Sequence, residues 1–156
     1  MPHIHEKVDF ISEVFVVHKD KVLLRKHDKY KIWLGVGGHV ELDEDPNEAA
    51  IREAKEEVGL DIRLTDFSGK QDSYTDSYKE LTPPIFLNRH AINDTHEHIA
   101  LIYFATSESD TVVAGGRDRS DEWKWFTKEE LEDTAYGVRE HVKFYARRAL
   151  EMLSRP

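Results

Sequence analysis

The chain has 156 residues, of which 39% are hydrophobic and 34% charged, and this length and balance predict one folded domain over residues 1–156. Its 22 basic and 31 acidic residues give a formal net charge of −9, which argues against a nucleic-acid binder that works through a basic surface. Because cysteine is absent, disulfides, thiolate metal sites and cysteine nucleophiles are excluded.

The apolar stretches of the chain are short. The longest run, residues 99–105, has seven residues, whereas a membrane-spanning helix needs about 18. The first ten residues, MPHIHEKVDF, lack the apolar core of a secretion signal. We therefore expect a cytoplasmic protein that does not associate with membranes.

The first predicted elements are strands. Residues 8–17 and 22–25 are rich in β-branched and aromatic side chains and flank a polar turn, which predicts a hairpin. Residues 32–36 form a further apolar run, and Gly37 and Gly38 after it predict a turn.

A helix is predicted next. Asp45 is a typical cap residue, Pro46 suits the first helical position, and Glu48 is placed to complete a capping box. Gly59 predicts the end of this helix.

The remaining chain alternates between strands and helices. Thr127 and Glu130 form a second capping box, which predicts a short helix, and apolar residues recur at helical spacing near the end of the chain. The predicted strands are residues 62–64, 85–88, 98–106 and 122–126, the last helix is residues 138–153, and residues 68–84 are predicted to be irregular. Strands flanked by helices indicate a layered α/β domain.

Negative charge is concentrated in the predicted helix 46–58 and the loop before it. Residues 41–57 contain eight acidic and two basic residues. Glu53, Glu56 and Glu57 stand at positions i, i+3 and i+4, so their carboxylates project from one side of a helix and repel one another.

The repulsion calls for a nearby positive charge. Helical geometry predicts that Arg52 and Lys55, the two basic residues of the helix, point away from the centre of the glutamate cluster. A hard cation such as Mg²⁺ or Mn²⁺ prefers carboxylate and backbone oxygen, and it would offset the repulsion. The alternative is a solvated helix face, which the small neighbours Ala49 and Ala50 disfavour.

The segment from Gly38 to Leu60, GHVELDEDPNEAAIREAKEEVGL, resembles the Nudix box. Gly38 is followed after five residues by Glu44, and after seven more by the run REAKEEVGL that begins at Arg52. Every polar position of the family pattern is matched. The resemblance implies an α/β/α sandwich around a mixed β-sheet.

The same resemblance implies a reaction and a cofactor. Nudix enzymes hydrolyse the diphosphate bond of a nucleoside diphosphate linked to another moiety, with Mg²⁺ or Mn²⁺ held by the box. By resemblance, Glu56 and Glu57 are metal ligands, Glu53 is a further ligand or the base that activates water, the Gly38 carbonyl is a backbone ligand, and Arg52 orients the catalytic carboxylates. The implied partner is a nucleotide-derived small molecule, and a homodimer is plausible.

Two further carboxylates lie outside this set. Glu44 is expected to be structural. Glu97 is a candidate for an additional metal ligand, because families of this type often recruit a carboxylate from outside the box. Glu97 is flanked by His96 and His98, and strand alternation points it away from both. The two histidines could equally be ordinary loop residues.

Substrate contacts are sought among cations and aromatic residues near the box. Arg25 and Arg89 lie on or beside predicted strands and are candidates for phosphate binding. Trp33 is a candidate for stacking on a base. The competing roles are solvation for the arginines and core packing for the tryptophan.

Two other functions are alternatives to hydrolysis. Isoprenoid diphosphate isomerisation, by resemblance to the isomerases of the family, needs a cysteine that this chain lacks. A non-catalytic nucleotide- or protein-binding module on the same scaffold usually has a broken box, whereas this box is intact.

Overall fold

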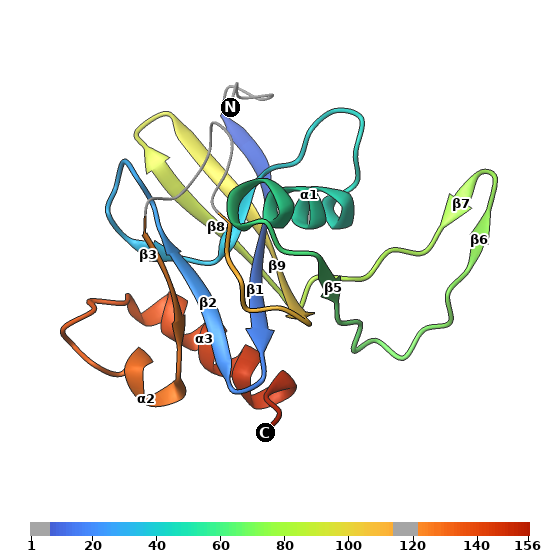
Figure 1. The fold of residues 1–156 in the computed structure, drawn as a ribbon. Helices are drawn as coiled ribbons and strands as arrows, with labels where there is room; N and C mark the ends of the chain where they lie inside the picture. Colours follow the sequence, from blue (N-terminus) through green and yellow to red (C-terminus); the bar gives the residue numbers. More distant parts are fainter. Residues whose placement is uncertain (1–6, 114–121) are drawn as a thin grey trace.

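The computed structural model describes residues 7–113 and 122–156, which fold around one large sheet (Figure 1). The elements are β1 (Val8–His18), β2 (Lys21–Lys26), β3 (Trp33–Leu34), β4 (Val36–His39), α1 (Pro46–Val58), β5 (Ile62–Leu64), β6 (Tyr74–Thr75), β7 (Tyr78–Lys79), β8 (Phe86–Asn93), β9 (His96–Ser107), β10 (Glu122–Phe126), α2 (Lys128–Leu131) and α3 (Glu140–Leu153).

The sheet is mixed, as predicted. Its main path runs β10-β2-β1-β9-β5, while β3 pairs with β2, β4 with β1, and β8 with β9. Strands β1 and β9 pair in parallel, in a register that extends from Val8 opposite Glu97 to Val17 opposite Thr106. The other strand pairs are antiparallel.

Helices cover both faces of this sheet, which confirms the predicted α/β/α sandwich (Figure 1). Side chains of β1 alternate between the two faces. Val14 and Val16 belong to the core under α1, whereas Phe15 and Val17 belong to the core under α3. Burial on both faces explains the continuous apolar run from Val14 to Val17 in β1.

The capping signals of α1 are confirmed. The Asp45 side chain accepts a hydrogen bond from the Glu48 backbone N–H, and the Glu48 side chain accepts one from the Asp45 N–H. Gly59 ends the helix in a left-handed conformation with φ of 69°. The second capping box, between Thr127 and Glu130, is also present.

The predicted turn at Gly37 and Gly38 is wrong. Both glycines lie within β4, opposite Glu13 and Ser12 of β1. A Cβ at Gly37 would lie 2.0 Å from the Ser12 carbonyl oxygen. Here glycine allows a close approach of two strands rather than a change of chain direction.

The irregular segment between β5 and β8 projects from the domain as an arm, tipped by the β6–β7 hairpin (Figure 1). Tyr74 and Tyr78 of the hairpin are exposed. The base of the arm is fixed to α1, because Asn47 and Thr82 exchange two hydrogen bonds of 2.9 and 2.8 Å. Among the described residues, no helix is both long and apolar enough to cross a bilayer.

Candidate active site

Small side chains let α1 approach the sheet closely. Ala50, Ala54 and Val58 are fully buried in the core between the helix and the sheet. Glu53 and Glu57 share this inward side and are each only 2% exposed, whereas the Glu56 side chain is half exposed. Burying carboxylates is costly unless positive charge or hydrogen-bond donors surround them.

Arg52 supplies part of this compensation. Its guanidinium donates to both carboxylate oxygens of Glu44, at 2.9 and 2.6 Å, to Glu53 at 2.9 Å and to Glu56 at 3.1 Å. It also donates to the backbone carbonyl of His39, at 3.1 Å. The expectation that Arg52 points away from the glutamates is therefore wrong, because its long side chain curls back along the helix surface.

The Arg52 network shifts the titration of its members. Hydrogen bonding from Arg52 lowers the pKa of Glu44, and the same contacts raise the pKa of Arg52. Burial raises the pKa of Glu53, and the nearby guanidinium opposes this rise. Glu44 thus anchors Arg52 from the side away from the cluster, which agrees with the structural role expected for it.

Arg25 provides the second positive charge. It reaches from β2 to form an ion pair with Glu57, and its side chain is only 13% exposed. Arg25 was predicted to bind substrate. It lies directly beside a box carboxylate, and substrate binding by this residue stays a prediction.

Gly38 brings its backbone against the same carboxylates. A Cβ at this position would lie 2.3 Å from Oε1 of Glu53, so an alanine would collide with that carboxylate. Carboxylate and backbone oxygens, with no sulfur or nitrogen ligand among them, are the donor set that Mg²⁺ and Mn²⁺ prefer. The residues present therefore fit a hard divalent cation.

A scan against protein-family models matches the NUDIX domain over residues 12–147. The chain belongs to the Nudix family. A hydrolase of the NUDIX family from Clostridium perfringens shares 36% identity with this chain, with a TM-score of 0.81, and the match covers 94% of this chain and 98% of the other.

More distant Nudix structures share the fold. A MutT NUDIX hydrolase from Burkholderia pseudomallei has a TM-score of 0.62 at 21% identity, covering 96% of this chain and 100% of its own. An Ap4A hydrolase from C. elegans has a TM-score of 0.67 at 16% identity, covering 92% and 96%. The family and the similarity to the Clostridium hydrolase identify this chain as a Nudix hydrolase.

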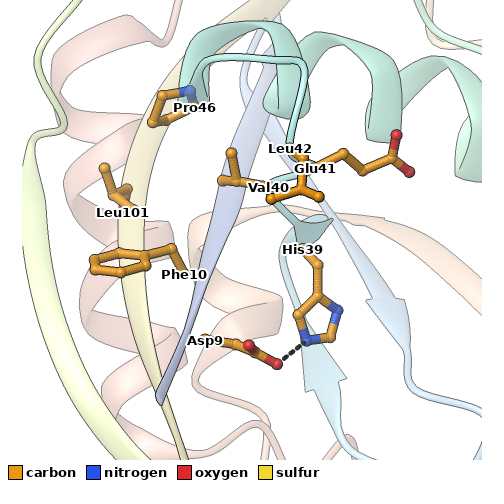
Figure 2. A pocket seen from close by; sticks show the side chains of 8 residues that line it. All are labelled: Asp9, Phe10, His39, Val40, Glu41, Leu42, Pro46 and Leu101. Carbon is orange, nitrogen blue, oxygen red and sulfur yellow. Dashed lines mark ion pairs between the residues drawn. The ribbon is translucent and has the colours of Figure 1, made fainter. Parts of the chain in front are cut away.

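A pocket lies beside the loop that opens the Nudix box (Figure 2). It is lined by Asp9, Phe10, His39, Val40, Glu41, Leu42, Pro46 and Leu101. Val40 to Pro46 belong to the box itself, so the pocket adjoins the segment that carries Gly38 and leads into α1. Sequence reasoning did not single out this pocket, because its wall combines the box with residues of β1 and β9.

The other predicted site residues of this Nudix protein lie on the sheet. Glu97 accepts two hydrogen bonds from Arg89, at 2.7 and 2.9 Å, so these two candidates bind each other at an exposed position. Trp33 is 8% exposed and packs edge-on against Phe126, which agrees with the core-packing alternative. A metal-binding role for Glu97 and substrate-binding roles for Arg89 and Trp33 stay predictions.

Proposed function

We propose that this Nudix hydrolase is a Mg²⁺-dependent pyrophosphohydrolase that cleaves the diphosphate bond of a nucleoside diphosphate linked to another moiety. The observation that carries the proposal is the cluster of Glu53, Glu56 and Glu57, which two arginines contact and whose Glu53 lies against Gly38. Mn²⁺ is an alternative ion with the same ligand preference.

The match to the Nudix box supplies the role that we propose for each member of the cluster. Glu53, Glu56, Glu57 and the Gly38 carbonyl would hold the ion, which when bound neutralises phosphate charge and activates a water molecule. Arg52 orients Glu53 and Glu56 through its hydrogen bonds, and fixed positions of this kind favour an in-line attack on phosphorus.

The charge of the protein limits how it binds its substrate. With a net charge of −9, the chain repels a polyphosphate except where cations are placed. A bound divalent ion near Arg25 would create such a place, and it would favour a small nucleotide-derived molecule over a long nucleic acid. The shared fold with an Ap4A hydrolase makes dinucleoside polyphosphates one class to test.

A substrate screen tests the proposal. The purified protein would be incubated with nucleoside triphosphates, dinucleoside polyphosphates and nucleotide sugars, each with Mg²⁺, with Mn²⁺ and with chelator. Mass spectrometry of the products would show which bond is cleaved. We expect metal-dependent release of a nucleoside monophosphate or diphosphate from at least one class. No product from any class would favour the binding-module alternative.

A matched pair of variants links the activity to the box. Glu56→Gln keeps the size of an exposed side chain but removes a charge, and we expect kcat to fall on the order of 10³-fold, because a lost ligand costs several kcal/mol of transition-state stabilisation. Glu129→Gln removes an exposed carboxylate of α2 and should leave kcat unchanged. Equal activity of both variants would contradict the assignment.

A further inference from the structure

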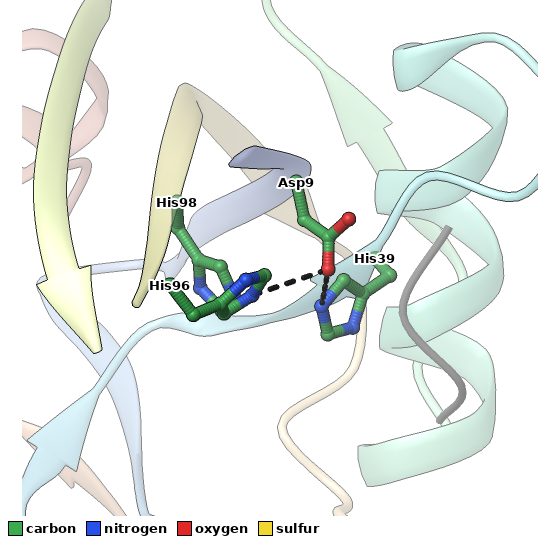
Figure 3. A group of neighbouring side chains, drawn as sticks. All are labelled: Asp9, His39, His96 and His98. Atoms are coloured by element: carbon green, nitrogen blue, oxygen red, sulfur yellow. Dashed lines mark ion pairs between the residues drawn. The ribbon is translucent and has the colours of Figure 1, made fainter. Parts of the chain in front are cut away.

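A second group of potential metal ligands lies outside the carboxylate cluster. Asp9, His39, His96 and His98 come from three neighbouring strands, β1, β4 and β9, and their side chains converge (Figure 3). One ligand atom from each residue lies within 4.8 Å of the ligand atoms of the other three.

The strand register explains why these side chains meet. Asp9 stands opposite His98 in the parallel β1–β9 pair, and His96 is two residues from His98 on the same face of β9. Ile11, on the same face of β1 as Asp9, stands opposite His39 of β4. All four side chains are thus directed to one face of the sheet.

This face is the one opposite to the carboxylate cluster. Gly38 faces Glu53 of α1, and the next residue of the strand, His39, faces the other way. Ile11, which shares the face with Asp9, packs against the core under α3. The two groups therefore lie on opposite sides of β4, and neither borrows ligands from the other.

Two of the separations between ligand atoms are close to the edge of a zinc coordination tetrahedron. Nε2 of His39 lies 3.2 Å from Oδ2 of Asp9, and Nε2 of His96 lies 3.3 Å from the same oxygen. For Zn–N and Zn–O distances of about 2.0–2.2 Å, this edge is roughly 3.3–3.5 Å. The remaining separations are within 4.8 Å, so binding would draw the four side chains closer together.

Burial also suits a cation. Asp9 is 1% exposed and His96 is 6% exposed, so a carboxyl group is enclosed beside imidazoles. The side chains of His39 and His98 are partly buried. Neutral imidazole nitrogen is a ligand that Zn²⁺ favours and Mg²⁺ does not.

We propose that Asp9, His39, His96 and His98 bind one Zn²⁺ ion in a site separate from the carboxylate cluster of Glu53, Glu56 and Glu57. Four protein ligands complete a tetrahedron, which is typical of structural zinc rather than of a catalytic ion with an open position. The ion ties β4 and β9 to the beginning of β1. The His39 backbone carbonyl accepts a hydrogen bond from Arg52, so the zinc site also fixes an acceptor of the Arg52 network.

Zinc binding to the full chain tests this proposal directly. Protein stripped with chelator would be titrated with Zn²⁺ in the presence of a chromophoric competitor and excess Mg²⁺. We expect one equivalent of tight binding that Mg²⁺ does not displace, together with an increase in Tm. Co²⁺ in place of Zn²⁺ should give the intense visible absorption of a tetrahedral cobalt site.

Three variants locate the ion. His98→Ala should weaken zinc binding by more than about 100-fold, since loss of even an outer-shell partner costs 10–100-fold. His90→Ala is the matched control, because its ring centroid lies 5.6 Å from that of His98 but it does not belong to the group of four. His90→Ala and Glu56→Gln should both still bind one equivalent of Zn²⁺.

The contrary results are equally clear. The proposal would be overturned by the wild-type protein alone if it failed to bind zinc or gave the weak spectrum of octahedral cobalt. Zinc binding lost in Glu56→Gln but kept in His98→Ala would place the ion in the Nudix box instead. Circular dichroism of each stripped variant would confirm that the folded state is being compared.

Discussion

The carboxylate cluster of the Nudix box and the histidine group lie on opposite faces of β4, and they differ in how the chain assembles them. The cluster draws its carboxylates from one helix, and two guanidinium groups, of Arg52 from the same helix and Arg25 from β2, contact them. The histidine group draws its side chains from three strands and has one carboxylate among three imidazoles. The first suits a hard ion shared with phosphate, and the second suits a softer ion held by protein alone.

The comparison shows how one strand can serve two chemistries. Alternation along β4 directs Gly38 to α1 and His39 to the opposite face. The absence of a side chain at Gly38 gives room to a carboxylate, while the imidazole at His39 reaches Asp9. Substitutions along β4 should therefore separate the two sites or damage both.

Among the variants that test this comparison, Gly38→Ala is expected to have the largest effect. The new methyl group would collide with the Glu53 carboxylate, which can move because it ends a flexible side chain. We expect kcat/KM to fall on the order of 10²–10³-fold with little change in stability, because misplacing a catalytic group is costly. Steady-state kinetics and urea denaturation would measure both quantities. Zinc binding should persist, and its loss would show that the two faces are not independent.

Gly37→Ala should instead act on stability. Its Cβ would lie 2.0 Å from the Ser12 carbonyl oxygen, and this backbone atom cannot move without separating β4 from β1. We expect a loss of about 3 kcal/mol in the free energy of unfolding, at the upper end for overpacking. Activity and zinc binding should decline together as the temperature rises. A variant as stable as the wild type would contradict this packing.

Arg52→Lys should weaken the box by a smaller amount. Lysine keeps the charge but cannot reproduce the forked contacts with Glu44 and Glu53. We expect kcat to fall by roughly 10–100-fold while KM changes little, since the lost hydrogen bonds to charged groups are worth about 1.5–3 kcal/mol. A change confined to KM would indicate that Arg52 binds substrate rather than positioning the glutamates.

The smallest effect is expected for the pH dependence of stability, from Glu13, a buried carboxyl on β1 that belongs to neither site. Burial raises the pKa of Glu13, although a hydrogen bond from the Gly35 N–H and the charge of Arg25 oppose the rise. As pH rises above about 4.5, the unfolded chain loses this proton before the folded chain does, so this residue lowers stability with increasing pH.

Glu13→Gln isolates that contribution. Glutamine can still accept the hydrogen bond from Gly35 but does not titrate, so the variant should gain stability relative to the wild type as pH rises. Urea denaturation across a pH series would measure the difference between the two proteins. A constant difference at every pH would show that Glu13 titrates normally. Glu13→Gln should change neither activity nor zinc binding.

Local patterns predicted the elements well where a signal is contained within a few residues. The capping residues Asp45 and Thr127 begin their helices as predicted, and Gly59 ends α1. Gly37 and Gly38 misled the prediction, because the need for glycine arises from the neighbouring strand β1 and not from the local chain direction.

The two sites also differ in whether a local sequence pattern reveals them. The box is contiguous, so its spacing indicated both the chemistry and the family. The histidine group depends on the parallel register that sets Asp9 opposite His98, which no local pattern specifies. The available signal was strand alternation, which places His96 and His98 on one face of the strand and Glu97 on the other. The sequence prediction started this strand at residue 98, whereas β9 starts at His96.

The projecting arm gives the protein a place that tolerates modification. Its tip at Asp76 lies beyond the β6–β7 pairs, while Asn47 and Thr82 hold its base to the start of α1. Exposed hairpin tips are preferred positions for protease cleavage and for inserted sequence. A fluorophore or affinity tag placed at Asp76 would therefore report on the intact enzyme while leaving both faces of β4 undisturbed.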